Sequence, residues 1–333
     1  MSKLLFILFF SVTSIAYACD SCSDFDYFDV NNKGYIGLVY RYSYYNGYTN
    51  LPGTGFKVKR TKHSIVGDKN IYKASKNDYE AFHTVDLRFN YSYKKKLNFL
   101  VVLPYSFNYD YRESITPPIG SVYDSTITQK GIGDIYFIVS GIKKIEKKKI
   151  LHILKPGIGF SLPTGRFAVK SPDGIIQDPI HQPGKGTADF IMQFNYTMKY
   201  KNKLGIFSTN RYYNSLKKKE PQTIASGSLP DTYYHRFGNR FSSTNFLFYT
   251  IGNYNWKLIP KAGLHFEYTQ NDYLNGEEIA DLGGSSLLLT TGIDIKYKDF
   301  TILTDFRTPI YQNLNGNQLL NVGRLNMGLL YSF

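Results

Sequence analysis

The segment N-V-G-R-L-N-M-G-L-L-Y-S-F, residues 321–333, decides the fold. From Leu325 onward every second residue is large and apolar, and most of the residues between them are small or polar. This period of two indicates a β-strand with one apolar and one polar face. The segment ends on Phe333 with no polar tail, whereas a soluble protein usually ends in a solvated stretch. We therefore expect this strand to be paired within the fold up to its last residue.

The same alternation recurs through most of the 333 residues, for example over 85–93, 99–111 and 285–297. These segments run to roughly ten residues or more, the length that a tilted strand needs to cross a bilayer, whereas strands of soluble proteins average five or six. Mean hydropathy is −0.30 although aromatic residues make up 17% of the chain. No segment after the N-terminus approaches eighteen consecutive apolar residues, which excludes a helical membrane protein. The pattern predicts a transmembrane β-barrel rather than a soluble sandwich.

The connections between these segments alternate in length, which predicts an antiparallel barrel with short periplasmic turns and long extracellular loops. We expect about twelve strands, although ten or fourteen stay open because Arg240 and Phe246 share a face unless a bulge intervenes. Closure requires the last strand to pair with the first. The strands are placed near 34–45, 82–93, 99–111, 132–142, 150–162, 188–200, 204–214, 236–251, 257–268, 285–297, 299–309 and 322–333. Short connections lie near 94–98, 143–149, 200–203, 252–256 and 297–299.

Residues 1–18 predict a secretory signal peptide, with a basic start at Lys3, an apolar run over 4–10 and an A-x-A cleavage site at 16–18. A short acidic periplasmic segment, 19–33, would then precede the barrel at 34–333. Cys19 and Cys22 form a C-x-x-C pair, compatible with a small disulfide, a lipid on Cys19 or a metal site completed by carboxylates. We favour the disulfide, or an idle thiol pair, and expect no metal.

The formal net charge of +14 would ordinarily raise nucleic acid as a partner. The basic runs, such as 94–96 and 143–149, fall mostly in the short turns between strands. An exported protein also does not meet the chromosome. We therefore expect no nucleic acid partner.

Charged residues of both signs fall on the polar face of the predicted strands, and this face points into the barrel. They are either a polar permeation path or ion networks that hold a packed interior, and twelve strands do not decide between the two. We favour the path. No set of residues offers the geometry of a catalytic site, because His152 and His265 have no suitable serine after them and His181 lies in a loop, so we expect neither an enzyme nor a cofactor. The candidate lumen residues are Arg41, Asp86, Arg88, Asp134, Lys155, Asp189, Asp294, Asp305, Arg307 and Arg324.

Three glycine-containing stretches carry a family resemblance: K-G-I-G-D-I-Y-F (130–137), G-I-G-F-S-L-P-T-G (157–165) and Q-P-G-K-G-T-A-D-F (182–190). In this block of about 60 residues the chain resembles the outer-membrane transporter family associated with meta-pathway phenol degradation, a Bacteroidetes-type outer-membrane β-barrel. The resemblance implies a barrel that takes up small, often hydrophobic compounds, and it implies no catalytic residues.

The sequence thus predicts an outer-membrane β-barrel channel or transporter for passive uptake of small solutes, hydrophobic ones among them. The alternative is a non-conducting surface protein that binds a partner through its long loops. A strand that ends in phenylalanine also resembles the signal read by the outer-membrane assembly machinery, which makes Phe333 the predicted assembly signal. The expected partners are outer-membrane lipid, that machinery and an unidentified small solute, and the expected state is a monomer.

Overall fold

The computed structural model describes residues 33–48, 57–58, 71–73, 75–116, 123–167, 179–216, 222–226, 229–233, 235–274, 276–278, 282–316 and 318–333. The predicted signal peptide, Cys19, Cys22 and the acidic segment up to residue 32 lie outside these residues. Within the described part of the chain, no helix is long and apolar enough to cross a membrane.

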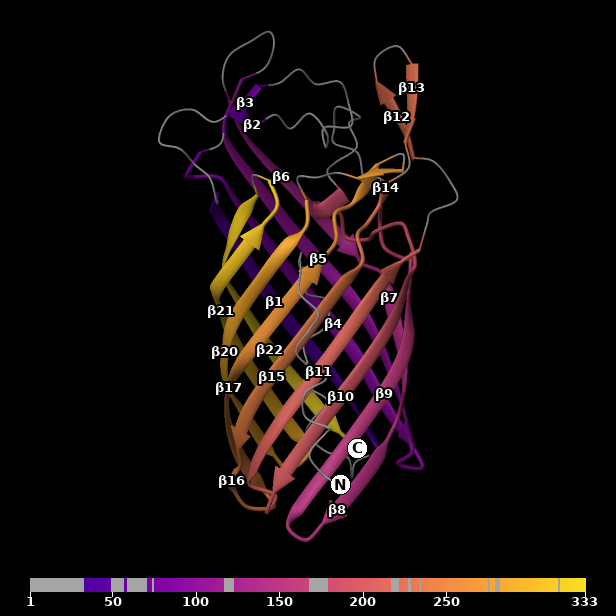
Figure 1. The fold of residues 1–333 in the computed structure, drawn as a ribbon, viewed down its shortest axis with the longest axis vertical. Coiled ribbons are helices and arrows are strands. Elements are labelled where there is room, and N and C mark those ends of the chain that lie inside the picture. The colour runs from indigo at the N-terminus through magenta and orange to yellow at the C-terminus, as the bar shows by residue number, and fades with distance from the viewer. Residues whose placement is uncertain are drawn as a thin grey trace, which may run out of the picture.

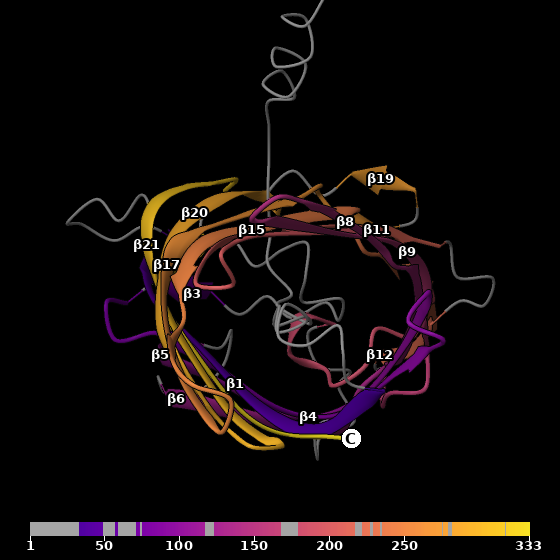
Figure 2. The ribbon, with the colours of Figure 1, turned by 90° about the horizontal axis from the view of Figure 1, so that it is seen from below.

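Twelve antiparallel wall strands close into a barrel (Figures 1 and 2), which confirms the predicted fold class and strand number. Two wall strands are interrupted: β6, β7 and β8 follow one another in one of them, and β15 and β16 in another. The wall elements are β1 (Gly34–Tyr48), β4 (Tyr79–Tyr93), β5 (Leu97–Thr116), β6 (Tyr123–Ile132), β7 (Ile135–Gly141), β8 (Lys143–Lys147), β9 (Ile150–Leu162), β10 (Asp189–Tyr200), β11 (Leu204–Ser215), β15 (Arg240–Tyr249), β16 (Ile251–Gly252), β17 (Trp256–Thr269), β20 (Gly284–Tyr297), β21 (Phe300–Leu314) and β22 (Leu319–Ser332).

The barrel closes where β22 pairs antiparallel with β1, in a register that runs from Tyr35 opposite Ser332 to Tyr44 opposite Gly323. The backbone N–H of Phe333 donates to the carbonyl of Gly34 at 3.0 Å, and the carbonyl of Phe333 accepts from the N–H of Lys33 at 2.8 Å. The terminal alternating segment is therefore paired up to its last residue, as the sequence predicts, and the seam leaves no free sheet edge there.

The two ends of the barrel differ. The short-turn mouth, as we call it, holds Gly34, Phe333 and the tight turns between neighbouring strands, and the long-loop mouth is the opposite end (Figure 1). The connection expected over 143–149 is shorter than predicted, because β8 pairs with β9 and leaves only Lys148 and Lys149 as the turn. The long-loop mouth carries β2 (Lys57–Val58), β3 (Ile71–Lys73), the 3₁₀ turn η1 (Pro179–His181), β12 (Gln222–Ser226), β13 (Leu229–Tyr233), β14 (His235–Arg236), β18 (Tyr273–Leu274) and β19 (Glu277–Glu278).

The two faces of the wall have opposite polarity, and β4 shows this clearly. Leu87 and Phe89 point outward and are 40% and 45% exposed, whereas Asp86 and Arg88 point inward and are 0% and 2% exposed. A soluble protein buries its apolar residues and exposes its charges, so this arrangement is inverted. An apolar outer band and a polar interior are what a strand wall inside a bilayer requires.

The strand predicted near 236–251, for which a bulge between Arg240 and Phe246 stayed open, contains no bulge there. β15 keeps one continuous register with β11 on one side and with β17 on the other. Arg240 and Phe246 therefore share the inward face, and Phe248 follows them. Periodicity alone assigns a phenylalanine to the lipid side, but here Phe246 and Phe248 pack with Phe207 and Ile259 inside the barrel.

Candidate functional site

The barrel interior is the candidate site, and the structure brings several of the predicted lumen residues together. On β1 and β4, the Arg41 guanidinium donates two hydrogen bonds to the Asp86 carboxylate, both at 3.0 Å. The Arg88 Nη2 donates to the same carboxylate at 2.8 Å. One buried aspartate therefore pairs with two arginines through charge-assisted hydrogen bonds.

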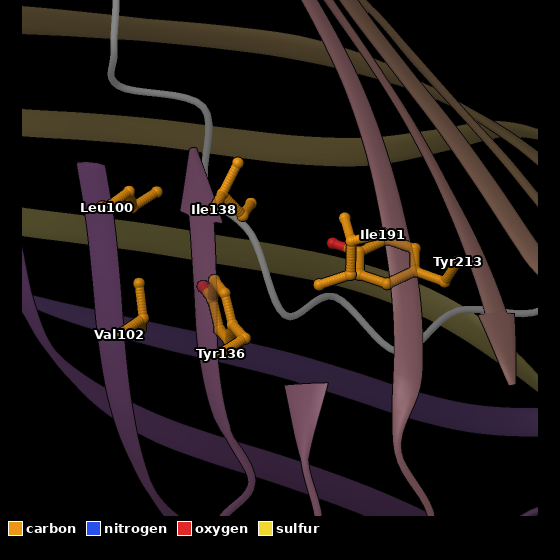
Figure 3. Packing of buried hydrophobic residues seen from close by; sticks show 6 residues of the cluster. All are labelled: Leu100, Val102, Tyr136, Ile138, Ile191 and Tyr213. Carbon is orange, nitrogen blue, oxygen red and sulfur yellow. The ribbon is translucent and has the colours of Figure 1, made fainter. Parts of the chain in front are cut away.

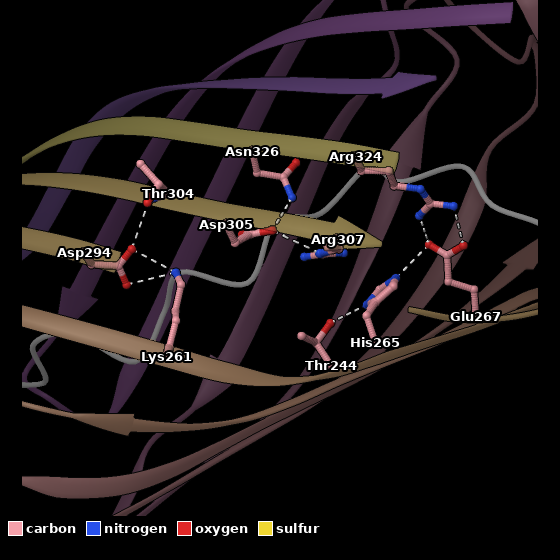
Figure 4. A network of polar contacts seen from close by, with 10 residues as sticks. All are labelled: Thr244, Lys261, His265, Glu267, Asp294, Thr304, Asp305, Arg307, Arg324 and Asn326. Atoms are coloured by element: carbon pink, nitrogen blue, oxygen red, sulfur yellow. Dashed lines mark hydrogen bonds and ion pairs between the residues drawn. The ribbon is translucent and has the colours of Figure 1, made fainter. Parts of the chain in front are cut away.

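A larger polar network covers the interior faces of β15, β17, β20, β21 and β22 (Figure 4). Arg324 and Arg307 lie directly opposite each other on β22 and β21. Their like charges are tolerated because each has its own carboxylate: Asp305 accepts from Arg307 Nε at 3.1 Å, and Glu267 accepts from Arg324 Nη2 at 2.8 Å. Since Glu267 stands on β17, the Arg324 side chain spans the two intervening strands.

The same network holds a histidine that sequence reasoning left isolated. His265 Nδ1 lies 2.6 Å from the Thr244 hydroxyl, and its Nε2 lies 2.7 Å from Glu267 Oε1. This hydroxyl–imidazole–carboxylate order resembles that of a hydrolase triad, but the Glu267 carboxylate is also bonded to Arg324 and all of these side chains are buried. Thr244 comes from a different strand, so residue spacing gave no sign of the contact. We assign this cluster a structural role in the wall.

The remaining predicted lumen residues on the strands are also buried. Asp294 accepts two hydrogen bonds from Lys261 Nζ, at 2.8 and 2.9 Å. Asp189 accepts from Arg240 Nη2 at 3.1 Å and pairs with Lys185. Lys155 of β9 points into the barrel and is paired in register with Asn195 of β10. Lys261, Arg240 and Glu267 were not among the predicted site residues, although they lie on the polar face of their strands.

A loop folds inward at the long-loop mouth. His181 of η1 is buried and stacks on Phe82 of β4, with ring centroids 5.6 Å apart and an interplanar angle of 7°. Its carbonyl accepts from Asn108 Nδ2 of β5 at 2.8 Å. Both Phe82 and Asn108 are on the interior side of the wall. The described residues 179–188 therefore narrow the barrel at this end.

Charged side chains surround the tip of this loop. Arg112 pairs with both Glu80 and Asp110, and His181 Nε2 lies 3.5 Å from Glu80. The ligand atoms of Glu80, Asp110 and His181 lie within 4.8 Å of one another, a spacing that a metal ion could bridge. The Arg112 guanidinium already supplies the positive charge there, so the cluster holds together as an ion-pair network.

Asp134, also a predicted lumen residue, lies between β6 and β7. It contacts both described ends of the loop that joins β9 to β10, 163–167 and 179–188, which we call the inward loop. Its carboxylate accepts the backbone N–H of Gly165 at 2.9 Å and that of Lys185 at 2.8 Å. Gly165 and Gly184 touch so closely that a Cβ on Gly165 would lie 2.6 Å from the Gly184 Cα.

These contacts explain the three motif stretches, which are far apart in sequence. K-G-I-G-D supplies Asp134, L-P-T-G supplies Gly165, and Q-P-G-K-G supplies Gly184 and Lys185. We call the cluster of Asp134, Gly165, Gly184 and Lys185 the loop anchor. The sequence showed these stretches only as a family resemblance, because their joint role depends on contacts between separate segments.

Apolar side chains form a band across the interior wall of β5, β7, β10 and β11 (Figure 3). Gly159 of β9 lies in register between Ile138 and Ile191, and a Cβ there would come within 2.8 Å of the Ile138 side chain. The band therefore crosses β9 at a glycine. Its members are Leu100, Val102, Tyr136, Ile138, Ile191 and Tyr213.

Fold and interior together define the class of protein: an all-β, twelve-stranded antiparallel barrel of the outer-membrane type. An outer-membrane channel from Pseudomonas putida F1 is similar in structure, with a TM-score of 0.61 and 13% identity, over 94% of this chain and 100% of that one. The NanC porin is a more distant match, with a TM-score of 0.41 and 11% identity over 89% of this chain and 100% of its own. No protein-family model and no curated protein matches the chain.

Proposed function

We propose that this protein is an outer-membrane channel for the passive passage of small solutes, with the short-turn mouth in the periplasm. The observation that carries the proposal is the charged and polar lining of the interior. Among the described residues, ten arginine and lysine side chains are buried on the inward face of the strands, against six aspartates and glutamates.

The lining also bears on the class of solute. Positive charge in a low-dielectric passage attracts anions and repels cations. The apolar band of Figure 3 adds a surface for the hydrophobic part of a solute, and Arg240 lies at its edge, 4.7 Å from the Tyr213 ring centroid. Small anions with an apolar portion are therefore the solutes that we propose. The proposal includes export by the signal peptide 1–18 and function as a monomer.

We expect the purified protein to conduct in planar bilayers and to prefer chloride over potassium under a salt gradient. Replacing Lys155 or Arg211 with glutamine should shift the reversal potential toward cation preference, because each removes a buried positive charge. Lys203→Gln, which removes an exposed charge from a turn, is the matched control and should leave selectivity unchanged. A preference for cations would contradict the solute class, and the absence of any conductance would remove the channel proposal.

One observation favours the alternative of a non-conducting protein that binds a partner through its long loops. The interior charges are buried and largely ion-paired, as in Figure 4, which suits a filled interior as well as a narrow path. If the protein folds in bilayers but never conducts, this alternative becomes the better account.

Phe333 supplies a prediction about assembly. Its ring is 45% exposed and lies 6.3 Å from the Phe89 ring on the outer face. Phe333→Asp should sharply lower the amount of folded barrel in the outer membrane, whereas Phe333→Tyr should not. A charge near the membrane interface costs only about 0–1 kcal/mol, so the refolded Asp variant should be almost as stable as the parent. Equal cellular levels of heat-modifiable barrel in both variants would argue against an assembly signal at Phe333.

A further inference from the structure

The tight turns of the short-turn mouth contain lysines in an unfavourable backbone conformation. Among the described residues, six other than glycine have positive φ, and all six lie in these turns. Asn202 is one of them, and the others are Lys94, Lys95, Lys148, Lys201 and Lys298, with φ between 49° and 55°. Glycine and asparagine adopt this left-handed conformation at lower cost than lysine. Turn geometry therefore does not explain the choice of lysine.

Three of these lysines repeat one arrangement with the tyrosine that precedes them. The Nζ atoms of Lys94, Lys201 and Lys298 lie 5.1, 5.3 and 5.4 Å from the ring centroids of Tyr93, Tyr200 and Tyr297. The three tyrosines end their strands on the outward face and are 45%, 41% and 57% exposed. Aromatic rings at this position form the interfacial girdle of a membrane barrel, and each ammonium group stands next to it.

The charge of this mouth is strongly unbalanced. Among the described residues, the short-turn mouth holds twelve exposed lysines, against two exposed acidic residues, Glu146 and Asp299. Such a surface attracts an anionic layer within a Debye length. The lysines are 33, 94, 95, 96, 143, 144, 147, 148, 149, 201, 203 and 298.

We propose that the short-turn mouth binds anionic phospholipids of the surrounding leaflet, with one phosphodiester headgroup at each Tyr–Lys pair. The lysine ammonium pairs with the phosphate, and the tyrosine ring packs against the glycerol and upper acyl carbons. Long lysine side chains near a membrane extend toward the headgroups while their stems stay on apolar surface. This inference rests on the proposed membrane location, but it does not depend on conduction.

The test uses the mature full-length protein in vesicles of phosphatidylethanolamine, alone or mixed with phosphatidylglycerol. Retained phosphatidylglycerol is counted by native mass spectrometry after extraction. The triple variant Lys94→Asn, Lys201→Asn, Lys298→Asn should lose most of it, because asparagine keeps the left-handed turn but not the charge. The matched triple variant Lys143→Asn, Lys147→Asn, Lys149→Asn removes as many exposed charges from the β8–β9 hairpin and should retain it.

Equal losses in the two triple variants would show attraction by general charge and would overturn the role of the Tyr–Lys pairs. Retention in both variants, or no retention by the parent protein, would overturn the proposal altogether. In lipid-free detergent the triple variant at Lys94, Lys201 and Lys298 should unfold at the same temperature as the parent protein or at a higher one. A lower temperature would mean that the lysines hold the turns themselves, against the proposal. Conductance recorded in the same vesicles reports separately on the channel, so failure of either proposal can be recognised.

Discussion

Replacing Arg324 with methionine is expected to lower the free energy of unfolding by about 3–5 kcal/mol. The Arg324 guanidinium is buried and donates to both oxygens of the Glu267 carboxylate across two intervening strands. Without it, Glu267 keeps a buried negative charge, and its remaining ion-pair partner among the described residues is His265. Denaturant titration of the refolded barrel in detergent measures the effect.

The double variant Arg324→Met, Glu267→Met should recover much of the lost stability, because it removes both charges together. Lys143→Met, at an exposed site on β8, should change the free energy of unfolding by no more than about 0.5 kcal/mol. A loss below about 1 kcal/mol for Arg324→Met would mean that water screens the pair, since exposed ion pairs contribute only that much. The size of the loss therefore separates a hydrated path from a packed interior.

Gly165→Val should detach the inward loop and lower the free energy of unfolding by about 1–3 kcal/mol. The new Cβ would lie 2.6 Å from the Gly184 Cα and 2.8 Å from Asp134 Oδ1, and backbone atoms cannot yield as a side-chain tip can. Residues 179–188 should then leave the mouth, so conductance should rise. Protease cleavage within 179–188 and single-channel recordings are the measurements.

Gly141→Val is the matched control, because a Cβ at Gly141 would meet no atom within 4 Å. It should leave cleavage and conductance unchanged. If Gly165→Val raises cleavage without raising conductance, the inward loop does not limit passage. If it changes neither, the loop anchor does not depend on the glycine contact.

Much of the fold could be predicted because it depends on local periodicity. The alternation in β4, β17 and β22 assigns each side chain to one face, and the short turns force neighbouring strands to pair antiparallel. The inward positions of Asp86, Arg88 and Arg324 follow from that parity. The alternation did not decide whether a bulge lies between Arg240 and Phe246. The continuous register of β15 with both of its neighbours showed that there is none.

The sequence by itself determined an antiparallel β-wall with an apolar outside and a charged inside, because a period of two needs no information from distant residues. Tertiary structure decided the rest. Arg324 meets Glu267, and Asp134 meets Gly165 and Lys185, only because the closed, curved wall brings together segments that lie 57, 31 and 51 positions apart. Spacing within one strand tells which face a charge occupies. It does not tell which charge on another strand lies within hydrogen-bonding distance of it.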